Sequence, residues 1–139
     1  MTATALDRIP MPPSARLLGW RMLDHDAARS WVRIGFQGKP DFCNPAGFIQ
    51  GGLLTAMLDD TMGPAVWIAT DGAWFTASID IAVSFLNPAR PGPLIAEATV
   101  IQRGRTIAFL EAQLWDESGT LICRATSTAR MVAAQQALK

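Results

Sequence analysis

One segment in the middle of the chain, from Gly51 to about Ala69, constrains the fold more than any other. Its apolar residues recur at steps of three and four, which predicts a helix. The repeating residues are Leu54, Met57, Leu58, Thr61 and Ala65, and further apolar residues occupy other faces: Leu53, Met62, Val66 and Ile68. A helix that is apolar nearly all round is a buried helix. The remaining segments must therefore surround it.

Those remaining segments have the pattern of strands. Two precede the helix (Arg16 to Met22 and Ser30 to Phe36) and four follow it (Phe75 to Phe85, Leu94 to Gln102, Thr106 to Trp115, and Leu121 to Met131). Phe75 to Phe85 alternates most clearly, with its odd-numbered apolar residues expected on one face. Gly104 and Gly119 stand in the turns between the last three strands, as hairpins favour. One helix against such an antiparallel sheet is an α+β fold.

The length of 139 residues suits one domain, and half of the residues are apolar, which is enough for a core. Three prolines between Pro10 and Pro13 predict an irregular N-terminal arm over residues 1–14. The tail over residues 133–139 reads as a short helix or as a segment without regular structure. We therefore expect a single domain over residues 1–139.

Charge and composition exclude several classes of protein. Twelve basic and twelve acidic side chains leave no net charge, whereas a nucleic-acid-binding protein normally has a basic surplus. The most apolar stretch is interrupted by Asp59, Asp60, Gly63 and Pro64, so no membrane span is expected. Two distant cysteines and a start without a signal peptide predict a cytoplasmic protein. A charged fraction of only 17% indicates apolar surface that is buried against a second copy of the chain.

The chain has one histidine, His25, in the sequence Asp24-His25-Asp26, which we expect to form an exposed turn. Ser-His-Asp triads, Cys-His pairs and histidine-rich metal sites all need a histidine near other functional groups. No metal site is therefore expected, and the chemistry must come from other side chains.

The sequence Gln50-Gly51-Gly52 opens the helix and is a candidate oxyanion site. The first N–H groups of a helix have no internal acceptor and lie at the positive end of its dipole. They can hold a carbonyl oxygen that becomes negative during a reaction, and Gln50 could add an amide donor. The alternative is a flexible turn that binds no ligand.

Asp59 and Asp60 lie in the middle of this apolar helix. Adjacent residues are separated by roughly 100° around a helix axis, so the two carboxylates are not expected to reach the same water. Because a buried carboxylate is unfavourable unless it is paired, one of them can belong to a catalytic site. The alternative role is a structural hydrogen bond within the chain or between two copies.

Together these residues resemble the PaaI-like branch of the hotdog thioesterase superfamily, over about residues 40 to 131. The pattern of that family is matched by Asn44, Gly47, Gln50-Gly51-Gly52 and Asp59, then by Ser78-Ile79-Asp80, Phe85-Leu86-Asn87-Pro88 and Gly104-Arg105. The match selects Asp59 rather than Asp60. It departs at Gln50, where the family has a histidine, and glutamine cannot act as an acid or base near neutral pH.

The resemblance implies a hotdog fold, in which an antiparallel sheet wraps around one long helix, and an acyl-CoA thioesterase. The Gly51 N–H would hold the thioester carbonyl, with Asn44 and Gln50 as further donors or orienting groups. Asp59 would act as general base or as nucleophile, and Ser78 would hold the water or the Asp59 carboxylate. No cofactor is expected besides the coenzyme A of the substrate. The implied partner is a second copy of the chain, in a homodimer that pairs again into a tetramer.

Substrate-binding residues are expected at Gly52 and at three turn arginines, Arg90, Arg103 and Arg105, which can bind the phosphates of coenzyme A. Trp67, Trp74, Phe75 and Met62 are candidates for the acyl pocket, although core packing is the commoner role of such residues. Two alternatives remain open. One is a hotdog dehydratase or acyltransferase, and the other is a non-catalytic protein that binds acyl-CoA or an aromatic ligand.

Overall fold

The computed structural model describes residues 3–137. Residues 1–2 of the expected arm and residues 138–139 of the expected tail lie outside the described part of the chain. In chain order the elements are η1 (Ala5–Arg8), α1 (Pro13–Leu18), β1 (Arg21–Asp26), β2 (Trp31–Gly38), η2 (Pro40–Phe42), α2 (Gly51–Ala69), β3 (Trp74–Phe85), β4 (Gly92–Arg103), β5 (Ile107–Asp116), β6 (Leu121–Ala133) and α3 (Ala134–Ala137).

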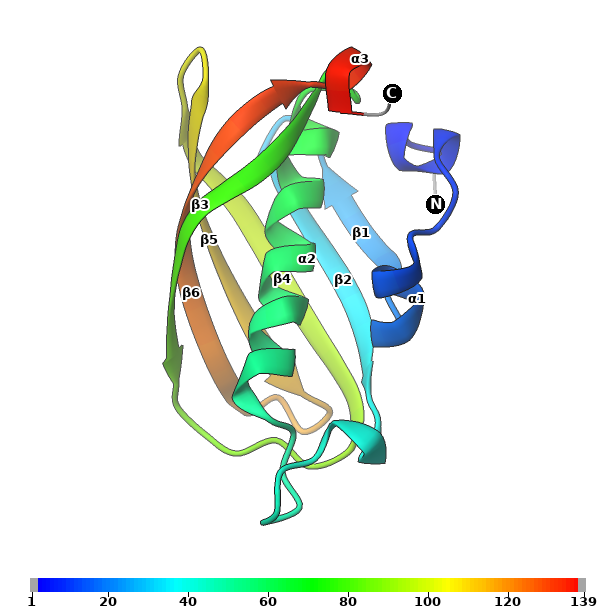
Figure 1. Cartoon of the computed structure of the whole chain (residues 1–139), viewed down its shortest axis with the longest axis vertical. Helices are drawn as coiled ribbons and strands as arrows, with labels where there is room; N and C mark the ends of the chain where they lie inside the picture. The colour runs from blue at the N-terminus through cyan, green and yellow to red at the C-terminus, as the bar shows by residue number, and fades with distance from the viewer. Residues whose placement is uncertain (1–2, 138–139) are drawn as a thin grey trace.

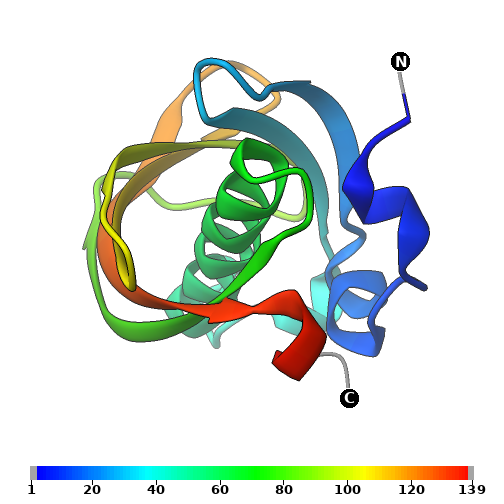
Figure 2. The ribbon, with the colours of Figure 1, turned by 90° about the horizontal axis from the view of Figure 1, so that it is seen from above.

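The strands form one six-stranded sheet in the order β1-β2-β4-β5-β6-β3, and every neighbouring pair is antiparallel. The sheet curves around α2, which runs through its concave side (Figures 1 and 2). This arrangement confirms the predicted hotdog fold. It leaves β1 and β3 as the two edge strands.

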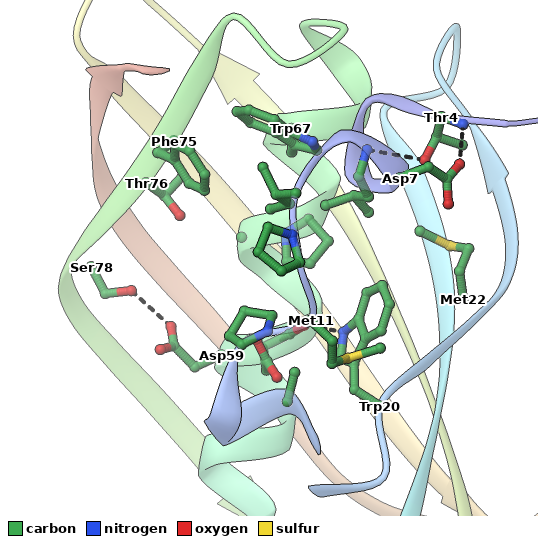
Figure 3. A pocket seen from close by; sticks show the side chains of 18 of the residues that line it. Thr4, Asp7, Met11, Trp20, Met22, Asp59, Trp67, Phe75, Thr76 and Ser78 are labelled. Atoms are coloured by element: carbon green, nitrogen blue, oxygen red, sulfur yellow. Dashed lines mark hydrogen bonds between the residues drawn. The ribbon is translucent and has the colours of Figure 1, made fainter. Parts of the chain in front are cut away.

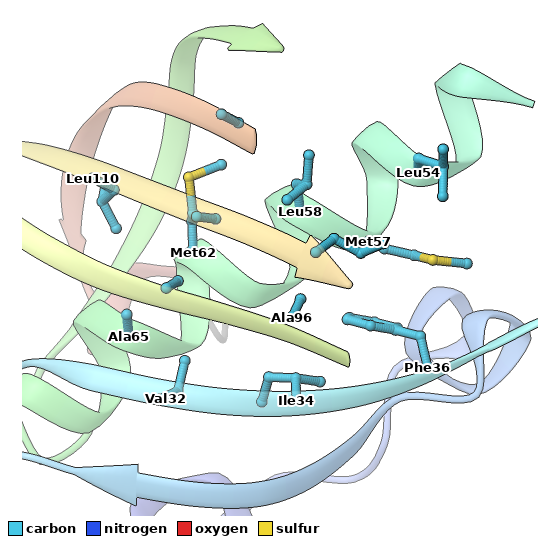
Figure 4. Close-up of a cluster of buried hydrophobic side chains, with 14 of the residues drawn as sticks. Val32, Ile34, Phe36, Leu54, Met57, Leu58, Met62, Ala65, Ala96 and Leu110 are labelled. Atoms are coloured by element: carbon cyan, nitrogen blue, oxygen red, sulfur yellow. The ribbon is translucent and has the colours of Figure 1, made fainter. Parts of the chain in front are cut away.

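Helix α2 has the bounds that the sequence predicts, and its inner face packs against β2, β4 and β5 (Figure 4). Large side chains of the helix, among them Met57, Leu58 and Met62, are fully or almost fully buried. They lie over alanines of the strands, because a small side chain on the concave face lets the helix approach the sheet closely. The buried strand alanines are Ala96, Ala98, Ala108, Ala112, Ala125 and Ala129. No helix among residues 3–137 is long and apolar enough to cross a membrane.

Pro64 lies inside α2 and links the helix to the segment before β1. Proline has no N–H, so the carbonyl oxygen four residues earlier, that of Asp60, loses its partner within the helix. The indole Nε1 of Trp20 donates to that oxygen at 3.0 Å. A break in the helix ladder is thus compensated by a side chain from a different part of the fold.

The expected first strand, Arg16 to Met22, is wrong in its first half. Residues Pro13–Leu18 form α1, which has a proline at its first turn and ends at Gly19 with φ of 71°. The strand begins at Arg21 and includes His25, which is half-buried and does not lie in an exposed turn. The turn follows at residues 27–30, where Ser30 has φ of 52°. The arm is also more regular than expected, since it contains η1 and the start of α1.

Strand β3 does not keep its odd-numbered residues on one face, as its sequence predicts. The pairing register with β6 shifts between Ser78 and Asp80, so Ile79 is an extra residue in a β-bulge. Before the bulge, Thr76 and Ser78 point towards α2, whereas after it Ile81 and Val83 pack against the core. Ile79 itself is 59% exposed. The bulge places polar side chains beside the middle of the helix.

Candidate active site

The loop that leads into α2 is held by hydrogen bonds at both ends. The Oδ1 of Asn44 accepts from the backbone N–H groups of Ala46 and Phe48, at 3.0 and 3.1 Å. The Ile49 N–H donates to the carbonyl of Ala89 at 2.8 Å, which ties this loop to the segment after β3. The side-chain amide N–H₂ of Asn44 remains available as a donor.

Gln50 is the N-cap of α2, and its Oε1 accepts from the Leu53 N–H at 3.2 Å. Gly52 permits this conformation, because a Cβ there would lie 2.7 Å from the same oxygen. The cap uses the oxygen of the carboxamide, so its N–H₂ group remains free to donate. Gln50 is exposed, as a residue that contacts a substrate would be.

The N–H groups of Gly51 and Gly52 have no acceptor among residues 3–137, as expected for the first turn of a helix. Gly51 lies under the ring of Phe85, where a Cβ would approach the ring carbons to 3.1 Å. Asn44 and Gly51 line the same surface hollow of about 320 Å³, together with Phe85 and residues of the loop that follows it. Two of the predicted carbonyl-binding groups thus face one space.

Asp59 lies on the exposed side of α2, and the Oγ of Ser78 donates to its Oδ1 at 2.7 Å (Figure 3). The bulge at Ile79 gives Ser78 the orientation that this bond requires. Both residues line a second and larger cavity of about 860 Å³, between α2, β3 and the N-terminal arm. The second oxygen of Asp59, Oδ2, is left free for a water or a substrate.

Asp60 faces the same cavity from a different angle and is half-buried. Its Oδ2 is buried and has no hydrogen-bond partner among the described residues. Burial, and to a lesser extent the neighbouring Asp59 carboxylate, raises the pKa of Asp60 to about 6. The carboxyl group with the perturbed pKa is therefore Asp60, whereas the family pattern selects Asp59.

The predicted site residues form two groups at different heights on α2. Asn44, Gln50, Gly51 and Gly52 gather at its N-terminal end, and Asp59 and Ser78 lie near its middle. Gly51 and Asp59 are eight residues apart, which is roughly 12 Å along a helix axis. One chain therefore does not bring the two groups to the same substrate atom.

The predicted phosphate-binding arginines lie at opposite ends of the folded molecule. Arg90 stacks over the ring of Phe48 at 5.1 Å, in the loop region beside the N-terminus of α2. Arg103 and Arg105 flank the turn between β4 and β5, which lies at the other end of the molecule (Figure 1). All three arginines are exposed.

Of the acyl-pocket candidates, Trp67 and Phe75 line the larger cavity, with ring centroids 4.4 Å apart. Met62 belongs to the core under the sheet, and Trp74 packs against that core, so neither lines the cavity. The far wall of the cavity comes from residues that were not predicted from the sequence: Ile9, Met11, Trp20 and Met22. For Ile9 and Met11, the available signal was an apolar side chain within the proline-rich arm. Within residues 3–137, no three His, Cys, Asp or Glu side chains are grouped as metal ligands would be.

Comparison with known proteins identifies the family of the chain. The family model of the thioesterase superfamily matches residues 46–123. Acyl-coenzyme A thioesterase 13 of Homo sapiens is 29% identical over 104 residues, which cover 73% of this chain and 74% of that protein. A phenylacetic acid degradation-related protein from Ralstonia eutropha has a TM-score of 0.85 and 29% identity, and the match covers 91% of this chain and 95% of that one.

A third relative is known with a ligand bound. A Streptococcus mutans protein, whose crystal structure contains acetyl CoA, has a TM-score of 0.73. It is 17% identical, and the match covers 82% of this chain and 89% of that one, so it shows the likeness of the fold alone. The family match covers more than half of the residues and includes Gln50, Gly51, Asp59 and Ser78. The chain therefore belongs to the thioesterase superfamily and is a thioester hydrolase.

Proposed function

We propose that the chain hydrolyses an acyl-CoA thioester to a free acid and coenzyme A, with Asp59 as the reacting carboxylate. The observation that carries the proposal is the hydrogen bond of 2.7 Å from Ser78 to Asp59 in the wall of a cavity large enough for an acyl group. Ser78 holds one carboxylate oxygen and leaves the other to face the substrate. The name of the human relative supports coenzyme A as the thiol.

Each site is completed by a second chain. A carbonyl held by the Gly51 N–H must lie within about 3–3.5 Å of its attacker, whereas Asp59 of the same chain is too far along the helix. Two α2 helices that run antiparallel about a two-fold axis bring Gly51 of one chain near Asp59 of the other. The free edge of β3, beside the exposed face of α2, offers the pairing that would hold the helices in this arrangement.

Catalysis then proceeds through a tetrahedral intermediate. Asp59 takes a proton from a water, and the oxygen of that water attacks the thioester carbon. The carbonyl oxygen becomes negative and is stabilised by the partner's Gly51 N–H, with the amides of Asn44 and Gln50 as further donors. One such donor is typically worth about 3 kcal/mol in the transition state. The intermediate collapses, the carbon–sulfur bond breaks, and the thiolate takes the proton from Asp59. In the alternative route Asp59 attacks directly, and water then hydrolyses the acyl-aspartate.

The same two-fold arrangement brings the phosphate-binding candidates together. Arg90 lies near the N-terminus of its own α2, and Arg103 and Arg105 lie near the opposite end. In an antiparallel pair the partner's Arg103 and Arg105 therefore approach this chain's Arg90. Arginine binds phosphate oxygens through two parallel hydrogen bonds. Three arginines from two chains would suit the phosphates of coenzyme A.

The test is a hydrolysis screen with acetyl-, hexanoyl-, decanoyl- and phenylacetyl-CoA, in which a thiol reagent detects the released coenzyme A. Turnover of at least one substrate that is lost in Asp59→Asn is the expected result. Binding of these thioesters without turnover would reject hydrolysis and favour the alternative of a non-catalytic acyl-CoA-binding protein.

A further inference from the structure

The segment Ile9–Pro12, here called the strap, crosses the open side of the larger cavity between two fixed points. On its N-terminal side, Ala5 is buried against Gly72, and Arg8 forms a solvent-exposed ion pair with Asp71 at 3.3 Å. On its C-terminal side, Ala15 and Leu18 of α1 are buried in the fold. The strap thus has a fixed length between two anchors.

Prolines stiffen the strap and leave one flexible side chain free. Pro10, Pro12 and the following Pro13 fix the backbone φ angles, so the strap has few alternative conformations. Met11 lines the cavity and is nevertheless 41% exposed, so the fold does not bury it. Figure 3 shows Met11 beside Trp20, whose ring is held by its hydrogen bond to the Asp60 carbonyl. Met11 and Trp20 therefore form one apolar end of the cavity.

The opposite wall is a trough along α2 that starts at Asp59. Asp59, Gly63 and Trp67 recur at four-residue steps on one face of the helix, which spans roughly 12 Å along the axis. Gly63 keeps the trough open, because a Cβ there would lie 3.2 Å from Thr76 Oγ1. The trough ends at the packed rings of Trp67 and Phe75. It starts at the proposed reacting carboxylate and ends between aromatic rings, as an apolar acyl group requires.

We propose that the strap is the outer wall of the acyl-binding pocket, and that Met11 sets the width of the acyl group that the enzyme accepts next to the thioester carbon. This inference rests on the proposed function, because it places the thioester carbon at Asp59. The substrate class that fits is an apolar acyl group well above acetyl in size, either a medium-length chain or an aryl-acetyl group. The volume of about 860 Å³ lies in the range of sites that enclose most of a small ligand.

The experiment measures kcat/KM for acetyl-, hexanoyl-, decanoyl- and phenylacetyl-CoA in Met11→Ala and Met11→Trp. Met11→Trp is expected to lower the phenylacetyl-to-hexanoyl ratio about tenfold or more, since a misfit of a few carbon atoms in a pocket discriminates by that amount. Met11→Ala is expected to raise the same ratio. Leu17 is the matched control, because it lies in the neighbouring helix α1, is 54% exposed and does not line the cavity. Leu17→Ala and Leu17→Trp should leave the ratio unchanged.

A binding measurement separates this inference from the proposed function. The dissociation constant of a thioether analogue of phenylacetyl-CoA, which cannot be hydrolysed, is measured by isothermal titration calorimetry, because Met11→Trp adds a fluorophore of its own. If no acyl-CoA is hydrolysed but Met11→Trp still weakens binding of the analogue, the proposed function fails and the role of the strap stands. If neither the ratio nor the dissociation constant depends on Met11, or if the wild type prefers acetyl-CoA, the inference is overturned.

Discussion

Asp59 and Asp60 are adjacent in sequence, but they differ in environment because roughly 100° of helix rotation separates them. Asp59 points to the exposed side of α2 and accepts a hydrogen bond from Ser78. Asp60 points towards the N-terminal arm, with one carboxyl oxygen buried and unpaired among residues 3–137. A reacting carboxylate needs access to substrate, which Asp59 has. The burial of the Asp60 carboxylate instead destabilises the folded chain, and measurements of the free energy of unfolding can detect this effect.

At Asp59 the prediction concerns catalysis. Asp59→Asn keeps the size of the side chain and its hydrogen bond with Ser78, but it removes the base or nucleophile. We expect kcat to fall by at least about a hundredfold, with the melting temperature nearly unchanged. Asp60→Asn is the matched control and should lower kcat much less. An active Asp59→Asn together with an inactive Asp60→Asn would show that Asp60, and not Asp59, is the reacting carboxylate.

At Asp60 the prediction concerns stability and pH. Its pKa is raised from 3.8 to about 6 in the folded chain, so folding favours the protonated form. The folded state therefore loses stability as pH rises from about 4 to about 6, and the loss persists above that range. Asp60→Asn cannot ionise and should stabilise the protein at pH 8 by about 1–2 kcal/mol, after allowance for solvent screening. Chemical denaturation at pH 8 and pH 4 measures this gain, which should vanish at pH 4. An equal gain in stability at both pH values would show that the ionisation of Asp60 is not its cause.

At the scale of elements, the long helix could be predicted and the short elements near the N-terminus could not. Helix α2 has a repeated apolar pattern over many turns, so its bounds follow from sequence alone. Helix α1 is only six residues long, and its apolar residues fit a strand as well as a helix. Its true signals were the proline at its start and the glycine after its end.

The bulge in β3 lay beyond prediction because a different strand creates it. Alternation within β3 predicts a regular strand, but β6 imposes the shift. The hydroxyl of Ser127 donates to the Asp80 carbonyl at 2.7 Å, and the Thr128 N–H donates to the Asp80 carboxylate at 3.2 Å. Asp59 and Ser78 could be nominated from the family pattern, but their contact depends on this bulge. The strap was missed because its role depends on contacts distant in sequence.

Strand β3 is an edge strand with exposed apolar residues, which predicts that two chains pair along it. Ile79 and Phe85 are 59% and 53% exposed, which is unfavourable unless another surface covers them. We expect Ile79→Lys to yield monomers in light scattering after size-exclusion chromatography, and to abolish hydrolysis. Ile101→Lys is the control, because Ile101 is 56% exposed but lies on β4. A dimeric and active Ile79→Lys would contradict an interface at this edge.

At the scale of the whole molecule, the structure separates two groups that the proposed reaction uses together. The free N–H of Gly51 and the carboxylate of Asp59 lie on one rigid helix, roughly 12 Å apart along its axis. Bending cannot bring them together, because α2 is packed against the sheet along its length. In the proposed dimer, a second chain supplies the missing partner for each group. The two-fold symmetry of that dimer predicts two equivalent sites.

Complementation between two inactive variants tests this shared site. Asp59→Asn removes the carboxylate, and Gly51→Pro removes the N–H at the first helical position, where proline is well tolerated. Gln50 already has the extended backbone that a following proline requires, and the nearby Phe85 ring is exposed enough to shift slightly. Each variant alone should be folded, as thermal melting will show, and inactive.

An equal mixture of the two variants, unfolded and refolded together, should contain about half heterodimers, each with one intact site of two. Activity should therefore recover to about a quarter of the wild-type value if the chains pair at random. Native mass spectrometry of differently tagged chains establishes that heterodimers have formed. If heterodimers form and no activity returns, the site is either built within one chain or carried by other residues. Recovery requires that a carboxylate from one chain reaches a carbonyl held by the other.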